Sequence, residues 1–155
     1  MSDGGIRVLL VDPFVEPREA SVDPSGGGVA RAIGCDRVDY VSLSDDGERS
    51  IDAWFDDEGI ARGAEPNRLV WATGDGAMTL DGDAGAEPVA LLCGRILVAA
   101  ADTRTGETVG LSDEEAARVR AALRQYLADK TVLIATHDAA LLALADHRID
   151  WEVSP

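Results

Sequence analysis

The chain has 155 residues, of which 46% are hydrophobic and 28% charged, which is enough apolar material for one domain but not for several. Acidic residues outnumber basic ones by 29 to 14, so the formal net charge of −15 opposes unassisted binding to nucleic acid or to an anionic membrane. No apolar run reaches the roughly 20 residues that span a bilayer, and the N-terminus lacks the basic and apolar regions of a secretion signal, so a cytoplasmic protein is expected.

Apolar and alternating residues predict four strands in the first half of the chain, at 6–12, 18–22, 38–43 and 50–55. Pro13 ends the first of them, because proline has no backbone N–H to donate. A short helix is predicted at 29–33, with Gly34 after its last turn. Residues 23–28 are expected to be a flexible connection, because the three consecutive glycines at 26–28 impose no backbone preference. A later apolar triplet at 69–71 could pair back on the strand at 50–55.

A polar loop and an interrupted apolar run follow in the second half. Residues 74–87 are rich in Gly, Asp and Ala and have little to bury, which predicts an exposed, mobile loop. The apolar run at 89–100 is interrupted by Gly94 and Arg95, so it is either one bulged central strand or two short strands. A turn is predicted at 103–106.

The clearest local signal is a capping box, in which Ser112 and Glu115 can satisfy each other's backbone donors. It predicts a helix at 113–128. Beyond this helix, a strand is predicted at 131–135 and a second helix at 138–145. The buried stripe of the capped helix is expected to contain Ala116, Val119, Leu123, Tyr126 and Leu127.

These elements predict an α+β domain with a mainly antiparallel, or mixed, sheet that two or three helices cover on one face. Residues 1–129 are expected to form the core of this single domain. Residues 130–155 are expected to add a strand and a helix that pack on the same domain. The strand at 131–135 would either extend the sheet or pair with a second copy of the chain across an exposed edge, so a homodimer is one expected assembly.

The sequence contains no motif for catalysis, metal binding or phosphate binding. No lysine or hydroxyl follows the glycines at 26–28 in the arrangement of a phosphate-binding loop. The aspartates of the polar loop lack the spacing of a calcium loop, and His137 and His147 have no third ligand at a spacing that suits zinc. Cys35 and Cys93 match neither a disulfide scaffold nor a metal knuckle. The sequence therefore predicts no catalytic residue, no metal and no cofactor, and it favours a role without catalysis.

Five segments carry a resemblance to a known family: Val11-Asp12-Pro13, Ala32-Ile33-Gly34, Asp57 to Arg68, Leu92 to Val98 and Leu111 to Glu115. The most distinctive is Asp57 to Arg68, where an acidic turn and a glycine precede Pro66-Asn67-Arg68. In these segments the chain resembles an uncharacterised family of short phage, plasmid and bacterial proteins, the domain of unknown function 3846. The resemblance implies a fold pattern and a mobile-element context. It implies no reaction, because the family has no established activity.

Asn67, Arg68 and Arg95 are the candidate ligand-binding residues. In a structural interpretation, Asn67 closes an Asx turn after Pro66 and Arg68 pairs with a carboxylate. In a functional interpretation, Asn67 and Arg68 recognise a carboxylate, phosphate or amide of a ligand, with Arg95 in the same concavity. Turn chemistry alone already accounts for these residue types, so the structural interpretation is favoured.

Three functions fit these observations. The first is a non-enzymatic binding or regulatory protein of a phage or plasmid, whose partner is a protein and not nucleic acid or a membrane. The second is an acidic decoy that occupies a DNA-binding protein, such as a host defence nuclease; this requires carboxylates that cluster in one elongated patch. The third is a small-ligand binder or enzyme with a pocket near Asn67, Arg68 and Arg95.

Overall fold

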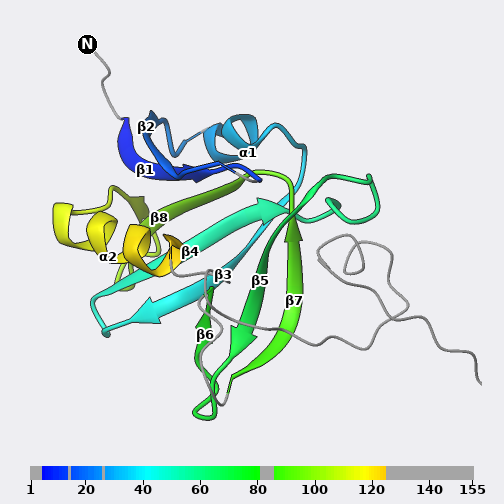
Figure 1. Cartoon of the computed structure of the whole chain (residues 1–155). Helices are drawn as coiled ribbons and strands as arrows, with labels where there is room; N and C mark the ends of the chain where they lie inside the picture. Colours follow the sequence, from blue (N-terminus) through cyan, green and yellow to red (C-terminus); the bar gives the residue numbers. More distant parts are fainter. Residues whose placement is uncertain (1–4, 14, 26, 81–85, 125–155) are drawn as a thin grey trace, which may run out of the picture.

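The computed structural model describes residues 5–13, 15–25, 27–80 and 86–124, which form the strands and helices shown in Figure 1. The predicted strands of the first half and the predicted short helix are confirmed. The predictions for residues 125–155, including the strand at 131–135 and the helix at 138–145, concern residues outside those that the structure describes. The elements are β1 (Ile6–Val11), β2 (Arg18–Val22), α1 (Gly28–Ile33), β3 (Val38–Asp45), β4 (Arg49–Asp56), β5 (Pro66–Ala72), β6 (Met78–Thr79), β7 (Glu87–Cys93), β8 (Ile96–Asp102), β9 (Thr108–Val109) and α2 (Asp113–Arg124).

The larger sheet, which we call sheet A, is antiparallel and has the order β2-β1-β8-β4-β3, with β9 also paired to β8. Because successive side chains of a strand point to opposite faces, sheet A supports two cores. In β1, Leu9 and Val11 pack in the core that includes α2, whereas Val8 and Leu10 pack in the core that includes α1. The two helices therefore lie on opposite faces of sheet A, and the expectation that helices cover one face is wrong.

The second sheet, sheet B, has the order β6-β5-β7 and is antiparallel. Residues 69–71 belong to β5 and pair with β7 and β6, so the expected pairing with the strand at 50–55 is wrong. The interrupted apolar run is two strands, since β7 lies in sheet B and β8 in sheet A. Within the predicted loop at 74–87, β6 pairs with β5 and Leu80 is only 3% exposed, so this part is ordered into the core.

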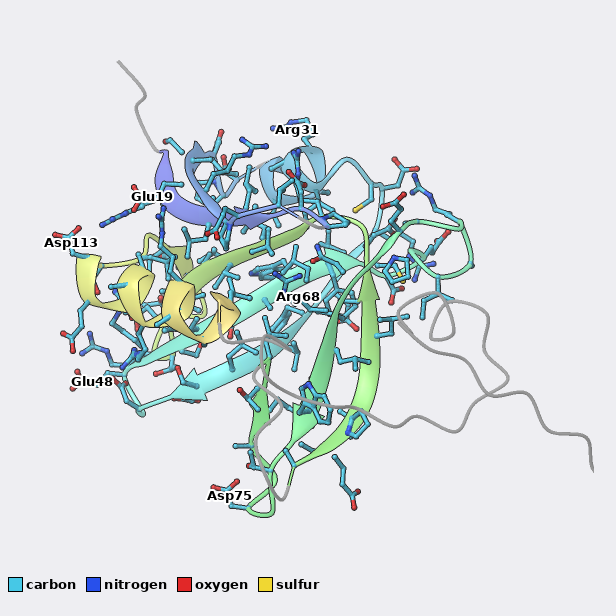
Figure 2. All side chains as sticks on the ribbon, viewed as in Figure 1. Glu19, Arg31, Glu48, Arg68, Asp75 and Asp113 are labelled. Atoms are coloured by element: carbon cyan, nitrogen blue, oxygen red, sulfur yellow. The ribbon has the colours of Figure 1, made fainter. Side chains whose placement is uncertain are left out.

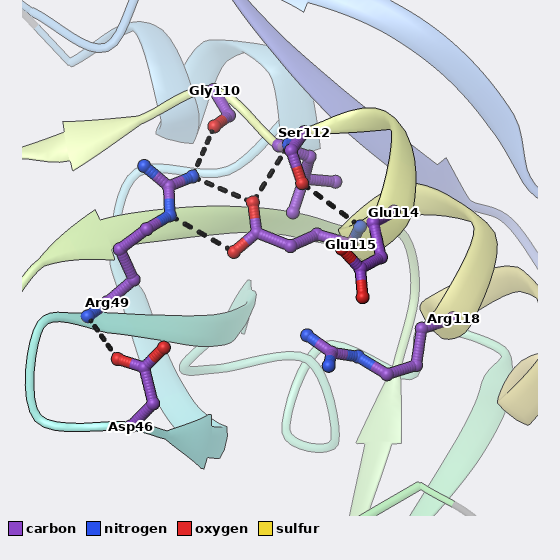
Figure 3. A pocket seen from close by; sticks show the side chains of 8 residues that line it. Asp46, Arg49, Gly110, Ser112, Glu114, Glu115 and Arg118 are labelled. Carbon is purple, nitrogen blue, oxygen red and sulfur yellow. Dashed lines mark hydrogen bonds and ion pairs between the residues drawn. The ribbon is translucent and has the colours of Figure 1, made fainter.

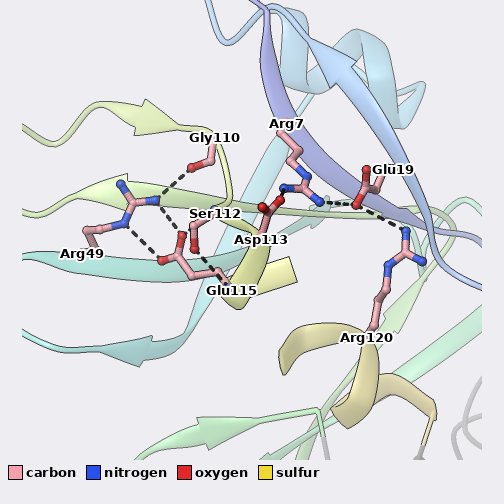
Figure 4. Close-up of polar contacts among 8 residues, drawn as sticks. All are labelled: Arg7, Glu19, Arg49, Gly110, Ser112, Asp113, Glu115 and Arg120. Carbon is pink, nitrogen blue, oxygen red and sulfur yellow. Dashed lines mark hydrogen bonds and ion pairs between the residues drawn. The ribbon is translucent and has the colours of Figure 1, made fainter. Parts of the chain in front are cut away.

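Helix α2 is attached to sheet A by its capping box and by arginines (Figure 4). The Ser112 N–H donates to Glu115 Oε1 at 2.8 Å and the Glu115 N–H donates to Ser112 Oγ at 3.1 Å, which confirms the predicted box. Arg7 of β1 pairs with Glu19 of β2 and with Asp113 in the first turn of α2. Of the predicted stripe, Ala116, Val119 and Leu123 are buried at 2%, 7% and 3% exposure, and the other two members lie outside the described residues.

The start of α1 requires glycine for steric reasons, which corrects the expected flexible connection. Gly27 has a φ of 78°, in the left-handed region that glycine adopts readily. A Cβ on Gly28 would lie 1.7 Å from the backbone oxygen of Asp23. The Asp23 carboxylate in turn accepts hydrogen bonds from the N–H and the hydroxyl of Ser25 at 2.9 and 2.7 Å. The loop before α1 is thus closely packed where it meets the helix.

Replacing Gly28 by alanine is expected to lower the free energy of unfolding by about 1–3 kcal/mol, the usual cost of overpacking. The added methyl group meets backbone, which cannot move aside as a flexible side chain would. Gly74→Ala is the control, because nothing lies within 4 Å of its added Cβ, and its effect should stay within about 0.5 kcal/mol. Urea unfolding of both variants makes the comparison, and equal stabilities would show that Gly28 has no steric role.

Candidate functional site

Asn67 connects the two sheets through its side-chain amide. It is the only asparagine in the sequence, stands near the start of β5 and is 4% exposed. Its Nδ2 donates to the carbonyl oxygen of Val11 at 2.8 Å and to that of Gly94 at 2.7 Å. Val11 ends β1 in sheet A, and Gly94 leads from β7 to β8. The amide therefore acts across the fold, between residues distant in sequence, and not in a local turn after Pro66.

Arg95 makes a second connection beside the first. Its Nε donates to Asp12 Oδ1 at 2.7 Å and its Nη2 to Asp12 Oδ2 at 3.3 Å, a bidentate arrangement. Its Nη1 donates to the carbonyl oxygen of Ala32, in the last turn of α1, at 2.9 Å. The hydrogen bonds from Arg95 hold the pKa of the Asp12 carboxyl below its usual value. Arg95 thus joins the end of β1 to the end of α1.

The predicted site residues belong to one cluster, which we call the junction cluster: Asp12, Asn67, Arg68 and Arg95. Arg68 joins it through Nη1, which donates to the backbone oxygen of Asn67 at 3.0 Å and to its Oδ1 at 3.1 Å. Both hydrogens of the Asn67 amide and all three nitrogens of the Arg95 guanidinium are directed at other groups of this chain. Ligand binding by Asn67, Arg68 and Arg95 stays a prediction, and the geometry favours their structural role.

The loop at 57–64, between β4 and β5, packs closely on the end of sheet B. A Cβ on Gly59 would lie 2.9 Å from the carbonyl oxygen of Cys93, so a larger residue does not fit without a shift. The Ala64 N–H donates to the Gly59 oxygen at 3.0 Å, and Ala64 packs against the apolar cluster that contains Cys93. The base of the loop is therefore fixed against the last residue of β7.

Ion pairs brace the outer side of the same loop. Arg62 lies 3.4 Å from Asp56, and Arg37 lies 3.7 Å from Asp57 and 3.6 Å from Glu58. These pairs are partly exposed and each contributes little to stability, but together they restrict the loop. Ile60, at the turn of this braced loop, keeps 49% of its surface exposed. The loop therefore presents an apolar side chain to solvent from a fixed base.

A shallow, solvent-open hollow of about 570 Å³ lies where the β3–β4 turn meets the start of α2 (Figure 3). In it, Arg49 donates to both oxygens of Glu115, at 2.7 and 3.1 Å, and to the oxygen of Gly110 at 2.9 Å. These bonds lower the pKa of the Glu115 carboxyl, chiefly through Arg49. Arg118 projects beside this pair, and Figure 3 draws no interaction from it. The Arg49 bonds in this hollow mainly anchor the start of α2 to sheet A. Its lining is Asp46, Arg49, Gly110, Leu111, Ser112, Glu114, Glu115 and Arg118.

Among the described residues, no group of three His, Cys, Asp or Glu side chains is placed to hold a metal ion. Cys35 and Cys93 are not in disulfides, and burial raises the pKa of the Cys35 thiol. His137 and His147 lie outside the described residues. Within the described ranges, no helix is long and apolar enough to cross a membrane.

Sequence reasoning missed three members of this region: Asp12, Gly59 and Gly94. A signal for them was present, because all three lie in segments that carry the family resemblance. Four of those five segments meet at the junction, through the bonds that Asn67 and Arg95 make to β1, to α1 and to Gly94. The fifth is the capping box of α2. The shared pattern therefore describes how the fold is held together.

The chain belongs to the family described as domain of unknown function (DUF3846), whose model matches residues 6–124, more than half of the sequence. The resemblance drawn from the five segments is confirmed. Comparison with curated proteins found no match, and comparison with solved structures found none either. The match ends at the last described residue of α2.

Asn67→Ala is expected to lower the free energy of unfolding by at least about 2 kcal/mol, because two carbonyl oxygens lose their donor and each such loss costs about 1–3 kcal/mol. Asn67→Asp keeps the size of the side chain but replaces the donating amide with a carboxylate oxygen. This oxygen would face the two carbonyl oxygens as a third acceptor, so the substitution should lower the free energy of unfolding at least as much at neutral pH. Chemical unfolding of both variants separates lost volume from lost donors. A fully stable Asn67→Asp protein would contradict the proposed role of the amide.

Glu115→Gln should flatten the acid limb of the stability profile. A folded-state pKa below the unfolded value of 4.5 gives stability that is present above that value and is lost as pH falls through the folded pKa. Glutamine keeps an acceptor for the capping box but removes the charge that pairs with Arg49. The gap in unfolding free energy between wild type and variant should therefore be constant at neutral pH and shrink as the pH falls below about 4.5. Glu114→Gln removes an exposed charge one residue away and should leave the profile parallel to wild type.

Proposed function

We propose that this protein is a non-enzymatic protein-binding module and that Ile60 is a central recognition residue. The observation that carries the proposal is the half-exposed Ile60 side chain on the loop at 57–64. This loop packs on β7 at Gly59 and is held by the ion pairs of Arg37 and Arg62. A single exposed apolar residue is ordinary. On a pre-organised loop, however, it can enter a partner's pocket with little further loss of conformational entropy.

The charges around the loop indicate the chemistry of the partner. Asp57 and Glu58 keep 41% and 49% of their side-chain surfaces exposed, and Asp36 and Glu65 are also exposed. Together with the net charge of −15, they favour a partner surface that is basic around an apolar pocket. Such charges mainly raise the association rate and select the partner, whereas the apolar contact at Ile60 supplies affinity. A phage or plasmid context remains an expectation from the resemblance.

The acidic-decoy alternative is less well supported, because many of the described carboxylates are engaged within the chain. Glu19 and Asp113 both pair with Arg7, and Figure 2 shows them on the same side of the molecule as Glu48, with Asp75 at the bottom. Several described aspartates accept backbone N–H bonds from the residue two positions on, which is the bonding of an Asx turn. These are Asp23, Asp45, Asp46, Asp56, Asp75 and Asp102.

The proposal is tested by affinity capture from the protein's source cells, with the wild-type chain, Ile60→Asp and Val89→Asp as baits. Val89 is the matched control, because it is 51% exposed but stands on β7 and not on the braced loop. A specific partner should be retained by wild type and Val89→Asp, lost with Ile60→Asp, and weakened as salt increases. Capture that is salt-sensitive but indifferent to Ile60→Asp would support the decoy instead, and turnover of a defined substrate would overturn the non-enzymatic role.

A further inference from the structure

The side chains of Tyr40 in β3 and Trp54 in β4 form an aromatic pair on the face of sheet A where α1 lies. The two residues stand opposite each other in the strand register, and their ring centroids lie 4.7 Å apart with a tilt of 38° between the rings. Trp54 packs against the core that includes α1, whereas Tyr40 keeps 50% of its surface exposed. The inner ring is thus anchored in the fold and supports an outer ring that is open to solvent.

The size of α1 accounts for the exposure of the outer ring. With six residues, α1 is about 9 Å long and about 10 Å wide, whereas sheet A measures about 19 Å from β2 to β3. Residues of α1 share a core with residues of β1, β2 and β8 and with Trp54. Strand β3 is the last in the sheet order, beyond this core. Its side chains on the same face, Tyr40 and Ser42, are exposed.

Two aspartates place negative charge beside the aromatic pair. The carboxylate of the exposed Asp39 is held next to the ring-bearing residue, because its Oδ1 accepts the Tyr40 N–H at 2.8 Å. Asp52, two residues before Trp54 on the same face of β4, is 4% exposed, and its Oδ1 accepts the Ser42 hydroxyl at 2.7 Å. Among the described residues, no ion pair includes either aspartate. A cation at this position would therefore meet two carboxylates that no arginine of the described chain neutralises.

We propose that this aromatic patch, made of Tyr40, Trp54, Asp39 and Asp52, is a docking surface for an arginine side chain of a protein partner. The exposed ring face of Tyr40 attracts a cation, and the two carboxylates add to that attraction. Arginine suits the patch better than lysine, because a planar guanidinium stacks on an aromatic ring and is more weakly hydrated than an ammonium group. Charge complementarity with a chain of net charge −15 favours this occupant over an acidic or neutral one.

The position of the patch connects it with the proposed function. Val38 pairs with Asp56, the residue before the loop at 57–64, and Tyr40 lies two residues, about 7 Å, further along β3. An interface of ordinary size, about 800 Å² on each partner, is wide enough to include both the loop and the patch. The inference rests on the proposed function in requiring a protein partner, and it adds a second contact and its chemistry.

The first test titrates the full-length chain with the capped tripeptide acetyl-Gly-Arg-Gly-amide, and NMR follows the Tyr40 ring and Trp54 indole signals. Both signals should shift and saturate with the arginine peptide. The matching lysine peptide should bind more weakly, and the matching leucine peptide should leave the signals in place. Tyr40→Leu keeps an apolar side chain without the aromatic ring, so it should weaken arginine binding at Trp54 about two- to fivefold.

The second test isolates the charge of the patch. Asp39→Asn keeps an acceptor for the Tyr40 N–H but removes the carboxylate, so the arginine peptide should bind about two- to fivefold more weakly. Asp45→Asn is the matched control, because Asp45 stands at the other end of β3 and its Oδ1 likewise accepts a backbone N–H, from Gly47 at 2.8 Å. This control should leave the affinity unchanged. Amide spectra of both variants check that the fold is retained.

Equal binding of the arginine and leucine peptides would overturn the inference, since the patch would then be an apolar contact without a role for charge. So would arginine binding that Tyr40→Leu or Asp39→Asn leaves unchanged, or no saturable shift with the arginine peptide. These outcomes are separate from those of affinity capture. If the peptide binds but no partner depends on Ile60, the proposed recognition by Ile60 fails and the patch stands; if a partner depends on Ile60 but the peptide does not bind, only the patch fails.

Discussion

The structure depends on one buried amide that satisfies two backbone carbonyls where the chain passes from one sheet to the other. Strand β7 lies in sheet B and β8 in sheet A, and only Gly94 and Arg95 separate them. A link this short gives the Gly94 oxygen no strand partner of its own, and a partly buried acceptor needs a donor. Asn67 supplies it, and its second hydrogen holds the end of β1. Strands from both sheets thus meet at one side chain.

This arrangement explains why the chain can be assigned to a family without being assigned a reaction. Asp12, Asn67 and Arg95 make their bonds to other groups of the chain, so the residues that reveal the family maintain its architecture. Function must then be sought in the surface that the junction cluster holds in place, and not in the cluster itself. The loop at 57–64 leaves the same corner with its base fixed on β7, and it carries Ile60 outward. A fixed base is what the proposed recognition by Ile60 requires, because it would reduce the conformational entropy lost on binding.

Local signals were predictable from the sequence, and long-range pairing was not. The capping box of Ser112 and Glu115 needs only residues three positions apart, so its pattern was sufficient. By contrast, the apolar residues on either side of Gly94 have the same periodicity whether they continue one strand or enter two sheets. Asn67 suggested a local turn, because a sequence does not show that its partner Val11 lies 56 positions away. Of the candidate site, residue types could be predicted, but their partners could not.

The acidity of the chain follows in part from the same demand for backbone satisfaction. Aspartate reaches the N–H two residues on, whereas the longer glutamate is less suited to this turn, and the sequence contains 19 aspartates against 10 glutamates. Hydrogen bonds from backbone N–H groups, chiefly those of Arg49 to Asp46 and of Arg104 to Asp102, lower the pKa of these two carboxyls. A fold with many short strands needs many turns. A negative surface is therefore expected here on architectural grounds, and charge alone is weak evidence for mimicry of a phosphate backbone.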